Sequence, residues 1–275
     1  MSEKQREIET ENELLKSKYS IMQHEWQCQQ HLIGQLIAQT EEIRSQIQRQ
    51  AEFCTLIGST IGDFLWKATH KPDVIQMILE QDKCARMSQM IEHVLRSFYE
   101  TYRVIPTADT DEVRFVLSVI GLVANLSTTD AGRKMFSNSE NGNKVVKLIV
   151  CILCRLKSPS GNRLKKVSYA ALYNISIHPT ASSLMENINL IRTLNEEIKI
   201  TADKEDVPDL RLFALKLLSS LTHNVCTRSM YNLLEKNITE SDILCLTAAV
   251  DSETEKTARQ LLENLRKVKA QYEKK

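Results

Sequence analysis

Apolar residues recur at alternating intervals of four and three along residues 15–47. The positions on this seam are Leu15, Tyr19, Met22, Trp26, Gln29, Ile33, Leu36, Thr40, Ile43 and Ile47. Such spacing predicts one long helix whose apolar stripe needs a partner helix. We therefore expect residues 1–50 to form a coiled-coil oligomerisation helix, with polar Gln29 and Thr40 setting its register. One helix folded back on the rest of the chain is the alternative.

A denser apolar pattern begins after Ala51, where we expect the heptads to end and a globular part to begin. Its first packed residues are predicted to be Cys54, Leu56, Ile57, Ile61, Leu65 and Trp66. Further helices are predicted over 72–80, 84–103, 111–128, 143–156, 162–177, 188–202, 207–223 and 227–236, with a last one from Ser252. The chain has only seven glycines and five prolines, which favours long helices with short connections and an all-α fold.

Three helical segments repeat one pattern about fifty residues apart. They are "GLVANLS" from Gly121, "AALYNIS" from Ala170 and "KLLSSLT" from Lys216. In register, they place Asn125, Asn174 and Ser220 at one equivalent position. Helical repeats of this length predict an armadillo or HEAT solenoid, in which equivalent positions line one concave surface. We assign residues 51–272 to an armadillo-type domain.

The recurring asparagine has two interpretations. A buried asparagine can satisfy a neighbouring turn, since buried polar groups are normally hydrogen-bonded. Alternatively, the amide can bond both the N–H and the C=O of an extended peptide, because it carries donors and an acceptor. Repeated along a groove, Asn125 and Asn174 would then form a ladder for a peptide backbone.

Neighbouring residues extend the predicted peptide site. At equivalent offsets from the asparagines lie Arg114 and Arg163, and small Gly121 matches Ala170. The small residues leave room either for a peptide backbone or for close helix packing. Thr129 or Asp130 can cap a short helix that carries Arg133 at the groove rim, and Arg228 has the same offset in the third copy. These arginines are either solvated charges or peptide contacts.

Composition narrows the function classes. The chain has 36 Lys and Arg against 35 Asp and Glu, so we expect no direct nucleic-acid binding. The sequence has no apolar run long enough to span a membrane, and its N-terminus is too polar for a signal peptide. We therefore expect no membrane partner. The seven cysteines are scattered and odd in number, a pattern typical of free, buried thiols in the cytosol or nucleus.

Two short patterns resemble redox or metal motifs. Cys151 and Cys154 form a C-x-x-C within an apolar helical run, without a second pair. His24, Cys28 and His31 share a helix face around "HEWQC", without a fourth ligand. We expect core and surface roles for these residues. Since glycine-rich phosphate loops, nucleophile elbows and paired carboxylates are also missing from the sequence, we predict no enzyme, catalytic residue, metal site or cofactor.

Four segments together carry a resemblance to a known family. They are Arg49–Trp66, Phe115–Phe136, Ala171–Ile177 and Thr257–Val268, in the same order and spacing. The chain resembles a divergent or invertebrate-like member of the family of heat shock factor 2-binding protein, the meiotic localiser of the breast-cancer type 2 susceptibility protein. The resemblance implies an oligomerising coiled coil joined to an armadillo domain that grips a repeated, disordered segment of that recombination mediator.

The resemblance also implies residue roles and partners. By position, Arg133 matches the family's peptide-binding arginine, and Asn125 and Asn174 match its groove asparagines. The implied job is recruitment of the mediator to meiotic double-strand-break sites, in the nucleus on meiotic chromosomes and also in the cytoplasm. A small meiotic cofactor protein is implied as a partner of the N-terminal helix, although residues 1–50 are fewer than in the family's coiled-coil region.

Two armadillo grooves on one coiled-coil stalk would hold a repeated peptide bivalently, which raises apparent affinity. The alternative function is a general armadillo peptide-binding adaptor or a nuclear-import-like receptor. A receptor for basic peptides would need acidic or tryptophan-lined groove positions, whereas this chain has Arg114 and Arg163 there.

Overall fold

The computed structural model describes residues 3–107, 109–199, 209–223, 225, 227–248 and 252–273. Within these ranges the chain consists of helices and connecting turns, without a strand. The helices are α1 (Glu3–Ala68), α2 (Pro72–Ile78), α3 (Gln81–Thr101), α4 (Asp111–Leu126), α5 (Asp130–Asn138), α6 (Glu140–Leu153), α7 (Asn162–Ser176), the 3₁₀ helix η1 (Ser182–Met185), α8 (Ile188–Ile198), α9 (Leu210–His223), α10 (Arg228–Asn237), α11 (Glu240–Leu246) and α12 (Ser252–Glu273). The predicted all-α class is confirmed.

Contacts divide the chain into two compact units, Met1–Cys54 and Thr55–Lys275. Helix α1 passes from the first unit into the second without a break, so no helix ends at the predicted boundary after residue 50. In the first unit, every described side chain is exposed. The apolar seam residues are among them, with Trp26 60% and Leu36 53% exposed. This exposed stripe is what a partner helix would cover.

The second unit begins with the last turns of α1, and only one face of these turns is packed. Leu65 and Trp66 are half-buried, as expected. Cys54, Leu56, Ile57 and Ile61 were also expected to pack, and that expectation was wrong, because all four are exposed. The apolar pattern alone does not say which face the neighbouring helix covers.

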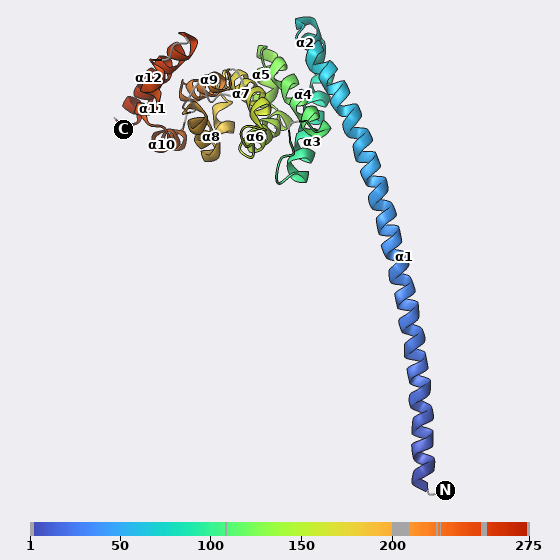
Figure 1. Ribbon diagram of the computed structural model, residues 1–275. Coiled ribbons are helices and arrows are strands. Elements are labelled where there is room, and N and C mark those ends of the chain that lie inside the picture. Colours follow the sequence, from blue (N-terminus) through green and yellow to red (C-terminus); the bar gives the residue numbers. More distant parts are fainter. Residues whose placement is uncertain are drawn as a thin grey trace. The chain divides into compact units, whose positions relative to one another are not determined.

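After α1, the described helices group into four units of three: α2–α4, α5–α7, η1–α9 and α10–α12. The third members stack in order, with α4 against α7, α7 against α9 and α9 against α12. Figure 1 shows these units following one another in chain order. Each three-helix unit buries its apolar face against the next. The compact part of the chain from Thr55 onward is therefore a helical repeat solenoid.

Local capping explains where several helices begin. Thr129 caps α5, as predicted, by accepting a hydrogen bond from Gly132 N at 3.1 Å. Ser139 caps α6 in the same way through Gly142 N at 3.0 Å, so α6 begins three residues before its predicted start. An N-cap oxygen stabilises a helix start by satisfying an otherwise unpaired N–H. The predicted end of α8 at 202 and start of α9 at 207 lie outside the described residues.

A buried ion pair joins two neighbouring units of the solenoid. Lys165 Nζ of α7 lies 3.0 Å from Glu197 Oε2 of α8, and both side chains are less than a tenth exposed. Lys165 also donates to Ser158 Oγ at 2.7 Å, and the Tyr169 hydroxyl donates to Glu197 Oε2 at 3.4 Å. Burial, followed by the charge of Glu197, raises the pKa of Tyr169 well above its usual value. The network depends on both charges, since either one alone would be buried without a counter-charge.

Among the described helices, none is by itself long and apolar enough to cross a membrane. Helices α4 and α5 reach the required length and hydropathy only together, and they are bent by 117° at their junction.

Candidate functional site

Three of the third helices, α4, α7 and α9, share one hydrogen-bonded turn at their C-terminal ends, and the end of α1 has it too. In each, a serine or threonine hydroxyl donates to the carbonyl oxygen three residues earlier. The pairs are Thr69–Trp66 at 2.8 Å, Ser127–Ala124 at 3.0 Å, Ser176–Tyr173 at 2.7 Å and Thr222–Ser219 at 2.8 Å. This repeated turn follows directly from the repeated sequence pattern.

The groove asparagines link each of these turns to the next helix. Asn125 Nδ2 donates to Trp66 O and Thr69 Oγ1, both at 3.0 Å, and Asn174 Nδ2 donates to Ala124 O at 3.0 Å. The amide nitrogens thus satisfy a neighbouring turn, which is the structural role considered for them above. Both side chains remain half-buried, and within the described ranges neither amide oxygen has a hydrogen bond. These oxygens can accept an N–H from a ligand.

Asn264 of α12 is a further member of this ladder that the sequence analysis missed. It donates from Nδ2 to Ser219 O at 3.0 Å, as Asn174 does to Ala124 O. The signal was present, because "LLENL" at 261–265 repeats the spacing of "LVANL" at 122–126. Asn264 is buried, so it ties helices together and has no surface for a ligand. At the intervening position, the Ser220 hydroxyl lies 2.7 Å from Ser176 Oγ, within hydrogen-bonding distance.

Arg133 is anchored to the same end of α4 as Asn125. Its Nη1 donates to Thr128 O at 2.9 Å and to Ser127 O at 3.3 Å, and its side chain is 19% exposed. Asn125 joins this turn because its own carbonyl oxygen accepts from Thr128 Oγ1 at 2.7 Å. The structure therefore brings two of the predicted peptide-binding residues onto one turn.

Asp130, the acidic neighbour of Arg133, pairs mainly with Lys134. Asp130 Oδ2 lies 2.7 Å from Lys134 Nζ, whereas its other oxygen lies 3.9 Å from Arg133 Nη2. The hydrogen bond from Lys134 is the main reason that the pKa of Asp130 is lowered. A guanidinium has five N–H donors, so Arg133 has donors left for carboxylate or carbonyl oxygens of a ligand.

Arg114 and Arg163 lie together at the opposite end of the third helices. Both are exposed and line a cavity of about 810 Å³. Leu117 and Val104 give it apolar surface, and its other charged residues are Arg103, Arg155, Lys157, Asp63, Asp109 and Asp111. Arg114 lies eleven residues before Asn125, which is about 16 Å along a helix. The predicted peptide-binding residues thus form two groups, one at each end of α4 and α7.

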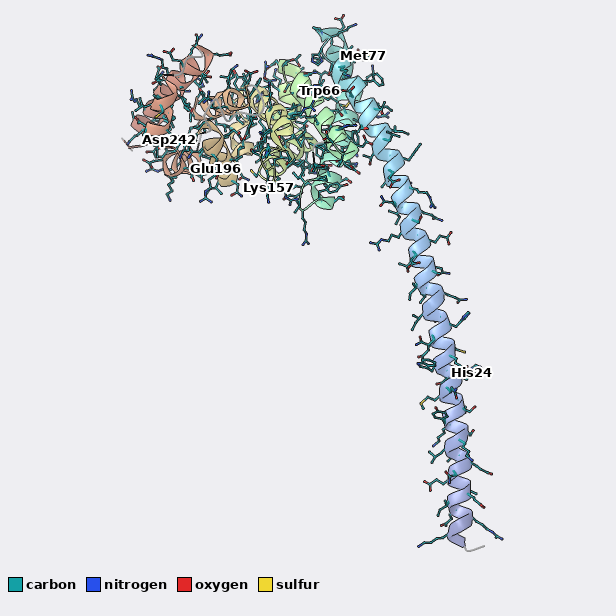
Figure 2. The ribbon with its side chains drawn as sticks, viewed as in Figure 1. His24, Trp66, Met77, Lys157, Glu196 and Asp242 are labelled. Carbon is teal, nitrogen blue, oxygen red and sulfur yellow. The ribbon has the colours of Figure 1, made fainter. Side chains whose placement is uncertain are left out.

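Gly121 has a packing role. It is buried, and a Cβ added there would collide with the Trp66 indole. Figure 2 labels Trp66 on α1. The Trp66 carbonyl is the one that Asn125 binds. Gly121 therefore lets α1 and α4 approach closely enough for this hydrogen bond to form. This is the helix-packing alternative that the sequence left open.

Arg228 does not repeat the arrangement of Arg133. Its Nη1 donates to Tyr272 O of α12 at 3.1 Å, within its own three-helix unit. Arg133, by contrast, binds the end of the third helix in the preceding unit. The equal offset in sequence therefore does not give an equivalent position in the structure.

The cysteine patterns have no redox or metal geometry in the described part of the chain. Burial raises the pKa of the Cys154 thiol to about 11, so little of it is the reactive thiolate at neutral pH. No group of three or more metal-binding side chains occurs within the described ranges. Cys54 and Cys245 are free and exposed, contrary to the expected burial. His24, labelled in Figure 2, is exposed on α1 and contacts Cys28 Sγ at 3.5 Å.

Comparison with known proteins finds a similar curated protein. No family model matches the chain. Heat shock factor 2-binding protein of Mus musculus is 26% identical over 232 residues, which cover 83% of this chain. This similarity supports the interpretation that the chain is a divergent relative of that protein. The resemblance to the heat shock factor 2-binding protein family inferred from the sequence segments is thereby confirmed. The alignment spans 66% of the mouse protein's own length, just under two thirds.

Two solved structures are also similar to the chain. One is an engineered protein, with 14% identity, coverage of 76% of this chain and 90% of that chain, and a TM-score of 0.45. The other is a designed armadillo repeat protein, with 15% identity, coverage of 75% of this chain and 92% of that chain, and a TM-score of 0.42.

Proposed function

We propose that the chain is a non-enzymatic adaptor of meiotic homologous recombination. Its armadillo-type groove binds an extended, repeated peptide of the breast-cancer type 2 susceptibility protein and recruits that protein to meiotic double-strand-break sites on chromosomes in the nucleus. The observation that carries the proposal is that Arg133 and Asn125 are anchored on one turn of α4 with hydrogen-bonding capacity left. The similarity to heat shock factor 2-binding protein supports it.

The chemistry of this turn suits an extended backbone. The free amide oxygen of Asn125 can accept a peptide N–H, and the remaining donors of Arg133 can bind a peptide carbonyl or carboxylate. Because the ladder and the Thr128 carbonyl hold both side chains in place, little rotamer entropy is lost when a peptide binds. Asn174 offers the same acceptor one unit further along the solenoid.

The exposed seam of α1 supports the second element of the proposal, which is a homo-oligomeric coiled coil. Two grooves on one stalk would bind a repeated peptide bivalently, and the high effective concentration of the second groove would offset the ordering of a disordered segment. A small meiotic cofactor protein is a further proposed partner of this helix. Neither membrane nor nucleic acid is proposed as a direct partner.

A general armadillo peptide-binding adaptor, or a nuclear-import-like receptor for basic peptides, is the alternative. Positive charges outnumber negative ones at the cavity, which argues against basic cargo: Arg103, Arg114, Arg155, Lys157 and Arg163 line it beside Asp63, Asp109 and Asp111. The Trp66 indole packs against Gly121 but also lines this cavity, where it is the feature that would suit a basic side chain. A basic peptide that bound more tightly than the mediator segment would favour this alternative.

Arg133→Glu should weaken binding of the mediator peptide by about thirtyfold or more, the range of an interface hot spot. The change removes the donors and introduces repulsion toward carbonyl and carboxylate oxygens. Calorimetric titration measures the affinity, and circular dichroism with thermal melting checks the fold. Arg259→Glu is the matched control, because it reverses the same charge at an exposed position of α12. A folded Arg133→Glu variant with unchanged affinity would remove Arg133 from the site.

A further inference from the structure

The cavity that Arg114 and Arg163 line is built from segments far apart in the sequence. The last turns of α1, the connection between α3 and α4, and the connection between α6 and α7 meet there. Its volume of about 810 Å³ is within the range of known ligand pockets. Because Arg114 is about three helical turns from Asn125, the charges of the cavity are separate from the turn that holds Asn125 and Arg133.

Most of the acidic residues at the cavity are neutralised by a neighbour. Asp63 Oδ2 lies 2.6 Å from Lys67 Nζ, and Asp111 Oδ1 lies 3.7 Å from Arg114 Nη1. Asp109 also lines the cavity and forms no ion pair within the described ranges. An anionic ligand would therefore meet little opposing negative charge.

Arg155 positions the connection before α4. Its Nη1 donates to Tyr99 O at 2.8 Å and to Tyr102 O at 3.1 Å, and its guanidinium carbon lies 3.5 Å from the centroid of the Tyr99 ring. These contacts hold the end of α3 directly before Arg103 and Val104, which both line the cavity. The donors of Arg155 are thus used within the fold, and its role at the cavity is to hold this connection in place.

Three further basic side chains at the cavity have no acidic partner in the part of the chain that the structure describes. Arg103, Lys157 and Arg163 are all exposed. They come from the connection before α4, the connection before α7 and the first turn of α7. Positive charges that converge on one concave site attract an anion more strongly than charges scattered over a surface.

Exposed apolar surface lies beside these charges. Val104 is 77% and Phe64 67% exposed, and both line the cavity together with half-buried Leu117. A large apolar side chain of a ligand would remove this surface from water, which is favourable. An inorganic anion would leave it exposed, so the cavity suits a ligand with both acidic and apolar groups.

We propose that the cavity binds an acidic peptide segment in which carboxylates flank one large apolar side chain. The carboxylates pair with Arg103, Lys157 and Arg163, and the apolar side chain packs on Val104 and Phe64. Guanidinium groups suit this ligand, because their planar donors bind a carboxylate through two hydrogen bonds. This site goes beyond the proposed function, since it does not involve the mediator segment.

Fluorescence anisotropy of a labelled synthetic peptide tests the site on the full chain. The probe has glutamates around one phenylalanine, and a matched control peptide has serine in place of the phenylalanine. The probe should bind with an affinity that falls as salt is added, and the serine peptide should bind about tenfold more weakly or less. Equal binding of the two peptides would overturn the proposal, because the charges alone would then hold any anion. A folded chain that binds neither peptide would also overturn it.

Exposed side chains allow the site to be located without disturbing the fold. Lys157→Glu should weaken binding of the probe by about tenfold or more. Lys236→Glu is the matched control, because Lys236 is exposed on α10 and has no ion pair in the described ranges. Val104→Ser should weaken binding of the probe but not of the serine peptide. If Lys157→Glu and Lys236→Glu bind the probe equally well, the cavity is not the site.

The mediator segment separates this inference from the proposed function. Arg133→Glu should bind the acidic probe as well as the unmodified chain does, and loss of probe binding in this variant would overturn the proposal. A chain that binds the mediator segment but not the probe would contradict this inference alone. A chain that binds the probe but not the mediator segment would contradict the proposed function alone.

Discussion

Replacing Glu197 with alanine should lower the free energy of unfolding of the solenoid by about 3–5 kcal/mol, the usual cost of leaving a buried charge without its partner. Glu197 is the only carboxylate within 4 Å of Lys165 Nζ among the described residues, and both side chains are buried. The change also removes the acceptor of the Tyr169 hydroxyl. Chemical denaturation followed by circular dichroism measures the loss.

Two companion variants separate this cause from a general effect of mutation. Glu263→Ala removes an exposed carboxylate that pairs with Lys267 one turn away on α12, and it should change the stability little. The double variant Lys165→Met with Glu197→Leu removes both charges and should recover most of the loss, because an apolar pair avoids the cost of burying charge. If Glu197→Ala were as stable as Glu263→Ala, the buried pair would not hold α7 against α8.

Gly132→Ala should destabilise the chain by about 1–3 kcal/mol and also weaken peptide binding. A Cβ at this position would collide with the carbonyl oxygen of Leu126, which is backbone and cannot rotate away. The start of α5 must then move from the end of α4, and the hydrogen bonds from Arg133 to Ser127 and Thr128 must break or lengthen. Thermal melting and peptide titration of one preparation measure both effects.

Gly34→Ala is the control for Gly132→Ala. Gly34 lies in the interior of α1 with no atom within 4 Å of an added Cβ, so alanine should stabilise the helix by about 0.5–1 kcal/mol. A loss of stability in Gly132→Ala together with a gain in Gly34→Ala would assign the effect to the α4–α5 junction. A Gly132→Ala variant with unchanged stability and peptide affinity would show that Arg133 does not depend on this junction.

Sequence periodicity predicted the long helix and the stacked third helices, because these have enough turns for a pattern to stand out. It missed η1 and α11, which have four and seven residues and offer too few turns for a 3.6-residue period.

The role of the asparagines could be predicted only in part. Their equivalence was visible in the repeats, but the carbonyl that Asn125 binds is 59 residues away and the one that Asn174 binds is 50 residues away. Which amide hydrogens are already engaged depends on how closely neighbouring helices approach, and small residues such as Gly121 control that distance. Likewise, the placement of Arg228 depends on α12, which its offset from the third copy does not reveal.

Calorimetric titration of the full chain with the repeated segment of the breast-cancer type 2 susceptibility protein from the same organism, with light scattering of the complex, tests the central claim most directly. The proposed function predicts tight binding with more than one groove engaged per peptide. A folded oligomer that gives no heat of binding with this segment would contradict the proposed function and leave a helical repeat solenoid whose ligand is another peptide.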